Sequence, residues 1–242
     1  MKPLPDFGEV AAVSFDFFNT LVFHRQGQGR GRALREYVVA HGYEPFPWEH
    51  QVLYDIFDLH ETEYDPDASA EERSKYYDAL SSRTLQRMGV TVSPDEAKRH
   101  ALSLWEILGP AAFEVFPDVV ETLSSLRSRG FPVIMISNWQ RGLRHLVKEL
   151  GLDPHFDHVV GSADFGVAKP DPRIFSKACE FIGVNPDRVL HIGDTFEDDY
   201  IGGAAAGLRT LLLDRGLVSS YPDAHAVSGL EQILPLLRMK SA

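Results

Sequence analysis

The sequence has little cysteine and no long apolar run. Its only cysteine, Cys179, lies in an apolar helical pattern, and a single thiol excludes an intramolecular disulfide and is typical of a reducing compartment. The first ten residues lack the apolar segment of a signal peptide, and no later run is long enough to cross a bilayer. These absences predict a cytoplasmic protein outside the membrane.

Positive charge is also scarce, with 24 Lys and Arg against 35 Asp and Glu and a formal net charge of −11. Nucleic acids and anionic membranes bind basic surfaces, so neither is expected as the main partner. A small anionic substrate remains compatible with this charge, because a local cluster of donors can oppose the field of the whole protein. We therefore expect a small-molecule substrate, and the sequence leaves both a monomer and a homodimer open.

Strand patterns alternate with helical patterns over the second half of the chain. Helices are expected over 140–150, 172–183 and 197–207, and a closing helix over 229–239. This alternation is typical of right-handed βαβ units, which build a parallel sheet covered on both faces. The expected fold class is therefore α/β, a Rossmann-like doubly wound parallel sheet. Its strands are expected at 11–17, 131–137, 156–162, 188–194 and 209–214.

A long helical stretch separates the first two strands, and it shows no strand pattern. Its last helix opens with Ser93 as N-cap and has Glu96 at the third position after it, the spacing of a capping box. We predict an all-helical cap over 26–112, inserted into a core made of 1–25 and 113–242. The helices of this insert are expected at 32–41, 47–64, 70–89 and 93–108.

Polar residues follow four of the predicted strands. In an open parallel sheet, ligands bind beyond the carboxyl ends of the strands, where the strand order reverses. These residues are therefore expected to meet in one crevice. They are Asp16, Asn19 and Thr20 after the first strand, Ser137 and Asn138 after the second, Lys169 after the third, and Asp194, Asp198 and Asp199 after the fourth.

A carboxylate, a hydroxyl and an ammonium in one crevice suit displacement at an electrophile that carries negative charge. Asp16 is the candidate nucleophile, Ser137 with backbone amides the candidate anion binder, and Lys169 the charge that offsets the anion. Asp16 and Asp194 are candidate Mg²⁺ ligands, because this hard cation prefers oxygen donors, and no Cys and His cluster indicates zinc. Each motif alone also fits an ordinary turn, and their order along the chain favours a functional site.

The segments SFDFFNTLV, MISN, AKPDPRIF and HIGDTFEDDYIGGAAAG resemble the four signature motifs of the haloacid dehalogenase-like hydrolase superfamily. The resemblance covers essentially the whole chain, and the insert resembles the helical cap that lies between the first two motifs of that superfamily. It implies a hydrolase with Asp16 as nucleophile. It also implies phosphate or substrate contacts from Thr20 and Ser137, charge stabilisation by Lys169, and a Mg²⁺ site made of Asp16, the backbone carbonyl of Phe18, Asp194 and Asp199, with Asp198 as the alternative to Asp199.

Phe18 departs from the phosphatases of this superfamily, which usually carry an Asp two residues after the nucleophile. That Asp protonates the leaving alcohol and then activates the attacking water, and such assistance is typically worth roughly 10²–10⁴-fold. Phe18 can do neither, which matters least for a good leaving group such as an acyl or aryl phosphate. We expect a Mg²⁺-dependent phosphatase that acts on a small phosphorylated metabolite through an aspartyl-phosphate intermediate.

Two other functions remain open. Dehalogenases of the superfamily carry an aromatic residue at the position of Phe18, because halide leaves without a proton, so a metal-independent 2-haloacid dehalogenase is the first alternative. Those enzymes lack the acid that Asp194 supplies, and residues 36–72, which contain no Lys or Arg, would repel a carboxylate substrate. The second alternative is a catalytically weak protein that binds a phosphorylated ligand or a partner.

Substrate contacts are also expected from residues beside these motifs. His24 is a candidate proton donor in place of the missing Asp, although a lone His more often packs in a core. Trp139 and Arg141 are candidates for the edge of the crevice, and Trp139 equally fits a packing role between cap and core. His191, inside the fourth strand, is expected to be a hydrogen-bonded core residue. The candidate substrate contacts are Asn19, Asn138, Trp139 and His24.

Overall fold

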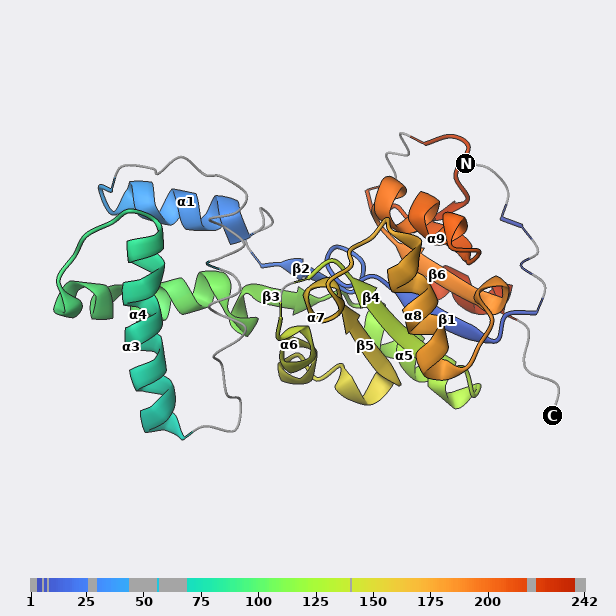
Figure 1. Ribbon diagram of the computed structural model, residues 1–242, viewed down its shortest axis with the longest axis horizontal. Helices are drawn as coiled ribbons and strands as arrows, with labels where there is room; N and C mark the ends of the chain where they lie inside the picture. Colours follow the sequence, from blue (N-terminus) through green and yellow to red (C-terminus); the bar gives the residue numbers. More distant parts are fainter. Residues whose placement is uncertain are drawn as a thin grey trace. The chain divides into compact units, whose positions relative to one another are not determined.

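The chain folds as two compact units. The sheet unit comprises residues 1–22, 115–139 and 151–242, and the helical unit comprises residues 23–114 and 140–150 (Figure 1). The computed structural model describes residues 4–5, 7, 9–25, 30–43, 56, 69–139, 141–216 and 221–237.

A six-stranded parallel sheet forms the centre of the sheet unit, in the order β5-β4-β1-β6-β7-β8. Since β4 and β6 flank β1 on opposite sides, the strand order reverses at β1, which makes its carboxyl end the place where a ligand is expected. This topology confirms the α/β doubly wound fold class. The strands are β1 (Ala12–Phe15), β4 (Val133–Ser137), β5 (His158–Gly161), β6 (Val189–Gly193), β7 (Arg209–Leu213) and β8 (Ala226–Val227).

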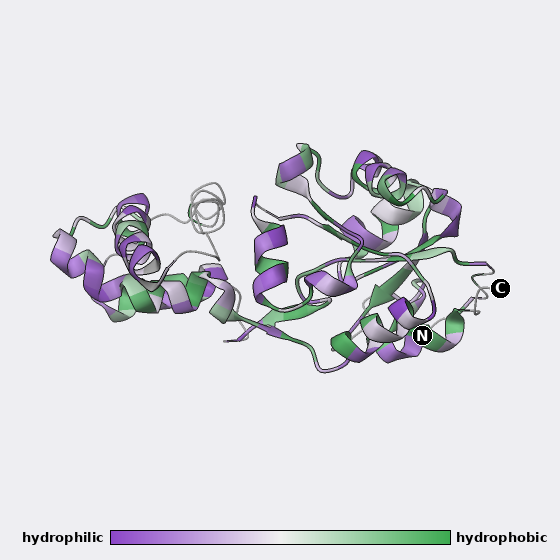
Figure 2. Ribbon diagram, turned by 90° about the horizontal axis from the view of Figure 1, so that it is seen from below, coloured by the Kyte–Doolittle hydropathy of each residue, from purple (hydrophilic) through white to green (hydrophobic). Residues whose placement is uncertain are grey.

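Helices lie on both sides of this sheet (Figure 2). Helix α8 (Pro172–Ile182) begins at the N-cap Asp171, whose carboxylate accepts a hydrogen bond from the Arg173 N–H, and ends at Gly183 with a φ of 64°. Its buried side chains pack on the apolar residues of β1, β4 and β5. The remaining regular elements around the sheet are α5 (Val119–Ser128), α7 (Ser162–Phe165), η2 (Asp153–His155) and η3 (Pro186–Arg188).

Two helices differ from the sequence prediction. The segment expected as one helix over 197–207 begins as a π-helix, η4 (Phe196–Ile201), and continues as α9 (Gly202–Ala205). The closing helix expected over 229–239 is a 3₁₀-helix, η5 (Leu230–Leu236), and Pro235 inside it has no N–H to donate to an α-helical bond.

The helical unit contains α1 (Arg30–Ala40), α3 (Ala70–Arg87) and α4 (Pro94–Leu108), followed by the 3₁₀ turn η1 (Pro110–Ala112). A buried apolar cluster that includes Leu34, Leu85 and Leu104 joins the three helices. The N-cap expected for α4 is present, since Ser93 accepts a hydrogen bond from the Glu96 N–H. The helix expected over 47–64 lies outside the described residues, apart from Ile56.

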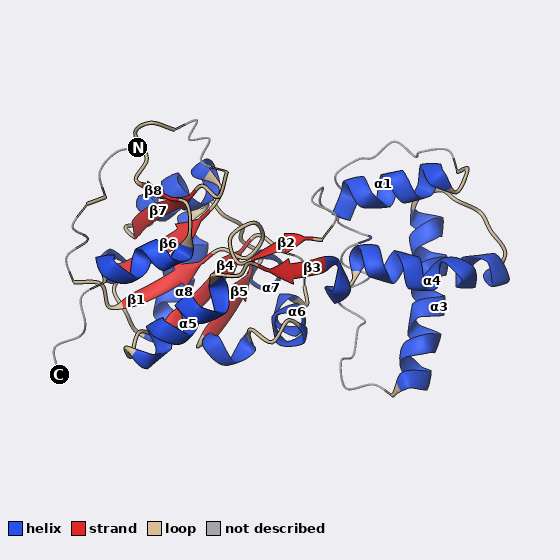
Figure 3. Ribbon diagram, turned by 180° about the vertical axis from the view of Figure 1, so that it is seen from behind, coloured by secondary structure: helices blue, strands red, loops and turns tan. Residues whose placement is uncertain are grey.

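A two-stranded sheet carries the chain out of the sheet unit and back. It pairs β2 (Val22–His24) with β3 (Phe113–Val115), and the division between the units falls within both strands. Figure 3 shows the contrast between the units, because the strands of the large sheet all belong to one unit and α1, α3 and α4 belong to the other.

Helix α6 (Leu143–Glu149) follows Gly142, which has a φ of 92°.

Arg215, in the loop after β7, joins three parts of the sheet unit. Its guanidinium donates two hydrogen bonds of 3.0 Å to the carboxylate of Asp118, at the start of α5, and one of 2.8 Å to the carbonyl of Thr20. It also lies 3.8 Å from the ring centre of Phe116. Asp118 in turn accepts the Leu230 N–H at 2.8 Å, so one ion pair ties the loop after β1 to the carboxyl-terminal part of the unit.

Replacement of Arg215 by alanine is expected to lower the free energy of unfolding by about 2 kcal/mol. The variant leaves the mostly buried Asp118 carboxylate without its counter-ion, and the loss stays below that of a fully buried pair because both side chains are 18–19% exposed. Urea denaturation measures the change. The control Lys177→Ala removes an exposed pair with Glu180 and should cost under about 0.5 kcal/mol; equal losses in both variants would contradict the expectation.

Candidate active site

Asp16 lies at the carboxyl end of β1, where it is 6% exposed. Its N–H donates to the Ile192 carbonyl of the neighbouring strand β6 at 2.9 Å, which holds the backbone in line with the sheet. The carboxylate atom Oδ1 accepts hydrogen bonds from Ser137 Oγ at 3.0 Å and from Lys169 Nζ at 2.6 Å. The structure therefore brings together the candidate nucleophile, hydroxyl and ammonium from three separate segments of the chain.

Lys169 is the positive centre of this site. Its ammonium is buried and lies 2.6 Å from Asp16 and 2.5 Å from Asp199. Burial alone would lower its pKa, but the negative charges and hydrogen bonds of Asp16 and Asp199 outweigh burial and raise the pKa of Lys169. The two carboxylates therefore favour the charged form of this buried side chain.

The backbone of Lys169 is held by Asn138. The Asn138 side chain accepts the Lys169 N–H at 2.7 Å and donates to the Lys169 carbonyl at 2.9 Å, while Nδ2 also donates to Asp198 at 3.2 Å. These contacts give Asn138 the work of positioning Lys169. The contacts of the two neighbouring acids also differ, because Asp198 accepts a hydrogen bond from Asn138 whereas Asp199 accepts one from the Lys169 ammonium.

The carboxylate of Asp199 is buried among three donors. Its Oδ1 accepts from Lys169 Nζ and from His191 Nε2 at 3.1 Å, and its Oδ2 accepts the Thr195 N–H at 3.0 Å. Burial raises its pKa, yet Lys169 and His191 outweigh burial and hold the pKa of Asp199 below its usual value. A Cβ on Gly193 would lie 2.2 Å from Asp199 Cγ, so only glycine at the end of β6 leaves room for this carboxylate.

His191 contacts the site through Asp199, a role that the sequence analysis did not predict, because it assigned His191 to the core alone. It is buried in β6, as expected for a core residue, with Nδ1 2.9 Å from Ser14 Oγ. The hydrogen bond from Nε2 to Asp199 gives His191 a second role, because it orients the acid that contacts Lys169. The only sequence signal for this part is the histidine that precedes IGD at the strand end.

Three acids form a group that fits a hard divalent cation. One carboxylate oxygen each from Asp16, Asp194 and Asp199 lie within 4.8 Å of one another, and oxygen donors of this type are the ligands that Mg²⁺ prefers. Burial, followed by the charges of Asp16 and Asp199, raises the pKa of Asp194 to about 7. Burial also raises the pKa of Asp16, against the effect of Lys169. A cation among these acids would offset the repulsion that both shifts report.

Thr20 and Asn19 lie in the loop after β1. Thr20 is fully buried, and its hydroxyl donates to Asp194 over 3.5 Å. Asn19 is exposed and adopts a left-handed backbone conformation with a φ of 59°, which asparagine tolerates better than most residues. The loop thus turns sharply between Asp16 and β2, and the Asn19 N–H donates to the Val22 carbonyl at 2.7 Å across this turn.

The two phenylalanines after Asp16 have different environments. Phe17 is fully buried and packs edge-to-face on Trp139 at 5.1 Å, whereas Phe18 is half-buried and tilted against Trp139 at 6.2 Å. Trp139 itself is 7% exposed. The side chain of Phe18 therefore stays outside the sheet core and forms an apolar wall with Trp139.

His24 and Arg141 belong to the helical unit. His24 is buried, with Nε2 3.1 Å from the Ile107 carbonyl, and burial lowers its pKa. These contacts account for His24 as a packed residue of that unit. Arg141 is exposed.

Comparisons with known proteins agree with this geometry. The sequence profile of the haloacid dehalogenase-like hydrolases matches residues 10–207. The chain is 36% identical over 164 residues to haloacid dehalogenase-like hydrolase domain-containing protein 3 of Bos taurus, covering 65% of each chain. It is 32% identical over 127 residues to a glyceraldehyde 3-phosphate phosphatase of Methanothermobacter thermautotrophicus, covering 50% of this chain and 54% of that protein.

A dehalogenase is similar to the chain as well. The (S)-2-haloacid dehalogenase 4A of Burkholderia cepacia is 36% identical over 128 residues, covering 50% of this chain and 54% of that enzyme. The matches thus span about half to just under two thirds of these relatives. The crystal structure of a HAD phosphatase from Thermococcus onnurineus has a TM-score of 0.62 at 19% identity, covering 96% of this chain and 100% of that one, and shows the shared fold. Among the described residues, no helix combines the length and apolar character needed to cross a membrane.

Replacement of Asp194 by asparagine is expected to stabilise the metal-free protein at pH 8.5 by at most about 4 kcal/mol. The folded-state pKa is about 7 against 3.8 for the free side chain. The stability contributed by this group is therefore complete below about pH 4 and is lost as the pH rises through 7. The amide removes the charge that causes this loss.

Chemical denaturation in the presence of a chelator, at pH 5 and pH 8.5, measures this difference. The gain should be large at pH 8.5 and small at pH 5, where Asp194 is protonated in the folded protein. Asp187→Asn, at an exposed position, is the control and should change stability by less than about 0.5 kcal/mol at both values. A gain of the same size at pH 5 and pH 8.5 would refute the assignment of the shift to Asp194.

Proposed function

This chain belongs to the haloacid dehalogenase-like hydrolases, whose profile covers residues 10–207, and from that premise we propose that it is a Mg²⁺-dependent phosphatase of small phosphorylated metabolites. The observation that carries the proposal is the Asp16 carboxylate, held by Ser137 and Lys169, with Asp194 and Asp199 close enough to share a cation with it. The similarity to a glyceraldehyde 3-phosphate phosphatase supports the same reaction class. In this proposal the helical segment 26–112 is the cap that contributes to substrate choice.

The proposed reaction begins at Asp16. A carboxylate oxygen attacks phosphorus, the bond from phosphorus to the leaving oxygen breaks, and an aspartyl phosphate forms. Ser137 Oγ and Lys169 Nζ both lie beside Asp16 Oδ1, so the phosphoryl oxygens meet a hydroxyl donor and an ammonium there. Water then attacks the aspartyl phosphate, releases inorganic phosphate and returns Asp16 as carboxylate.

The Mg²⁺ ligands in this proposal are Asp16, Asp194 and the backbone carbonyl of Phe18. Asp199, which is already bonded to Lys169, His191 and Thr195, is the fourth residue that would hold the cation, and it also keeps the ammonium in place. The cation supplies neutralisation of the phosphoryl charge and of the acids that surround it. The proposed electrostatic balance therefore needs both Lys169 and the metal, because three carboxylates outnumber one ammonium.

Asp16→Asn is expected to reduce phosphate release to background, because the amide is neither the nucleophile nor an anionic metal ligand. The substrates are acetyl phosphate and 4-nitrophenyl phosphate, and phosphate release is measured with Mg²⁺ and with excess chelator. The chelator should abolish activity of the wild type, and added Mg²⁺ should restore it. Activity that persists in chelator would contradict the proposed metal dependence.

The similarity to a 2-haloacid dehalogenase and the aromatic Phe18 make halide release the competing reaction. The same assay therefore includes 2-chloropropionate, with halide as the readout. Chelator-resistant halide release that is lost in Asp16→Asn would select the dehalogenase and overturn the proposal. Absence of every product would favour a protein that only binds a ligand.

Phe18→Asp is expected to raise kcat for a phosphate ester of a simple alcohol, which is a poor leaving group. Phe18 is half-buried beside the nucleophile, so an acid there can protonate the departing oxygen, with a gain of up to about 10²-fold, the lower end of general acid catalysis. Acetyl phosphate should gain much less, because its leaving group needs no proton. The control is Phe18→Asn, because asparagine has the shape of aspartate but no acidic proton. A gain in kcat equal to that of Phe18→Asp would exclude acid catalysis as its cause.

A further inference from the structure

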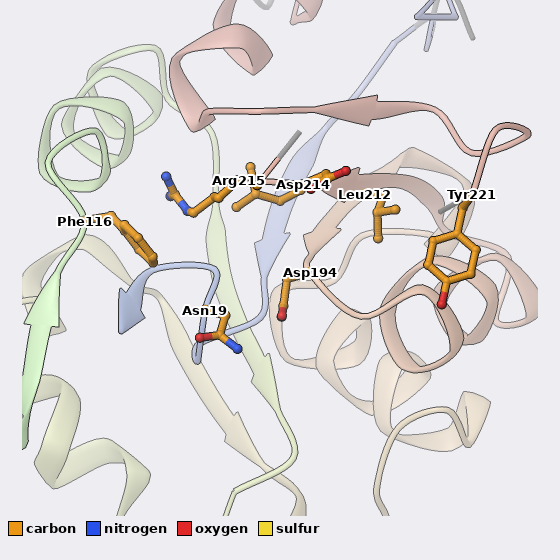
Figure 4. Close-up of a pocket in the computed structure, with 9 residues that line it drawn as sticks. Asn19, Phe116, Asp194, Leu212, Asp214, Arg215 and Tyr221 are labelled. Atoms are coloured by element: carbon orange, nitrogen blue, oxygen red, sulfur yellow. The ribbon is translucent and has the colours of Figure 1, made fainter. Parts of the chain in front are cut away.

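A cavity of about 400 Å³ lies beside Asp194 in the sheet unit (Figure 4). Its walls come from the loop after β1, the end of β6 and the segment that follows β7. This cavity shares Asp194 and Asn19 with the site of the proposed reaction. The cavity has the size of a small metabolite, so it offers room for the part of a substrate that extends away from its phosphoryl group.

The charge of this cavity is set by Asp214. In Figure 4, Asp194 lies below and Asp214 above the space, with Tyr221 at one side. Within the described part of the chain, the half-buried Asp214 carboxylate has no hydrogen bond and no ion pair. Arg215, the nearest cation in sequence, is engaged by Asp118. Arg215 also lines the cavity, but its guanidinium is paired with Asp118, so it does not offset the negative charge that Asp214 presents there.

The sheet places this charge close to the reacting group. Gly193 of β6 pairs with Leu212 of β7 in the parallel ladder, so Asp194 lies level with Leu213 and Asp214 follows one residue further on. Neighbouring strands are about 4.8 Å apart. A leaving group that starts at the phosphoryl site and passes Asp194 thus meets the Asp214 carboxylate within the length of a small molecule.

Aromatic stacking supports the side wall that carries Tyr221. Tyr221 stacks on Phe196 with ring centres 4.0 Å apart and planes 5° from parallel, and Phe196 stacks on Tyr200 at 5.5 Å. The Tyr200 hydroxyl accepts the His225 N–H at 3.2 Å. The wall that carries Tyr221 therefore packs on the π-helix η4.

We propose that this cavity binds the leaving group of the substrate, and that Asp214 selects phosphate monoesters whose leaving group carries a protonated amine, such as an amino sugar. A carboxylate without a partner forms its strongest hydrogen bonds with a cationic donor. The same charge repels leaving groups that carry a second anion. This inference rests on the proposed phosphatase function, since it concerns the other half of the same substrate.

The test compares four substrates with the full chain and Mg²⁺: glucosamine 6-phosphate, glucose 6-phosphate, 6-phosphogluconate and acetyl phosphate. The wild type should have the highest kcat/KM among the three sugar esters for glucosamine 6-phosphate and the lowest for 6-phosphogluconate. In Asp214→Asn, the ratio of kcat/KM for glucosamine 6-phosphate to that for acetyl phosphate should fall about tenfold, mainly through KM. Asp214→Glu, which keeps the charge, should retain most of the preference.

The matched control is Asp223→Asn, which removes the same charge at an exposed position outside the cavity and should leave the ratio unchanged. An unchanged ratio in Asp214→Asn, with acetyl phosphate still hydrolysed, overturns this inference and leaves the proposed phosphatase standing. No phosphate from any substrate overturns both.

A measurement on the wild type covers the case in which Asp214→Asn does not fold. Free glucosamine should inhibit hydrolysis of acetyl phosphate at concentrations at least about tenfold lower than free glucuronate. Equal inhibition by the two sugars overturns the inference, because the cavity would then show no preference for a cation over an anion.

Discussion

The structure of the site depends on one buried ammonium, that of Lys169, between the carboxylates of Asp16 and Asp199. Charges taken out of water must be paired, because the desolvation of each ion costs several kcal/mol. Lys169 therefore offsets the burial of both acids, and the two acids together keep the buried ammonium charged. The three side chains come from the end of β1, the loop between α7 and α8, and the π-helix η4. The geometry of the site therefore depends on the folding of all these parts of the sheet unit.

A second group of residues keeps this pairing in register. Asn138 holds the backbone of Lys169, and His191 with the Thr195 N–H holds Asp199, so both residues are positioned by contacts that do not involve Asp16. Gly193 leaves the space that the Asp199 carboxylate fills. The excess of negative charge that remains, centred on Asp194, is the charge that a divalent cation would neutralise in the proposed reaction.

The residues around Asp16 form two kinds of surface, one with hydrogen-bond donors and one that is apolar. Ser137 and Lys169 offer donors to an anion, whereas Phe18 and Trp139 form an apolar wall without any group that can transfer a proton. On the other side of Asp194 the cavity carries the charge of Asp214. Under the proposed function, such a site would favour substrates with a good leaving group and would select them by the charge of that leaving group.

The sequence by itself determined the parallel α/β sheet and the set of side chains at its carboxyl edge. Strand and helix periodicities are local, and parallel strands bring the residues that follow them to one edge, so Asp16, Ser137 and Lys169 were predictable as neighbours. Only the tertiary structure decided which of Asp198 and Asp199 meets the ammonium, because the turn of the π-helix η4 sets their directions. It also decided the bond of Arg215 to Thr20, since no local pattern links residues so far apart in the chain. Long-range partners of this kind depend on packing of the whole unit, whereas periodicity reports only which face of each element is buried.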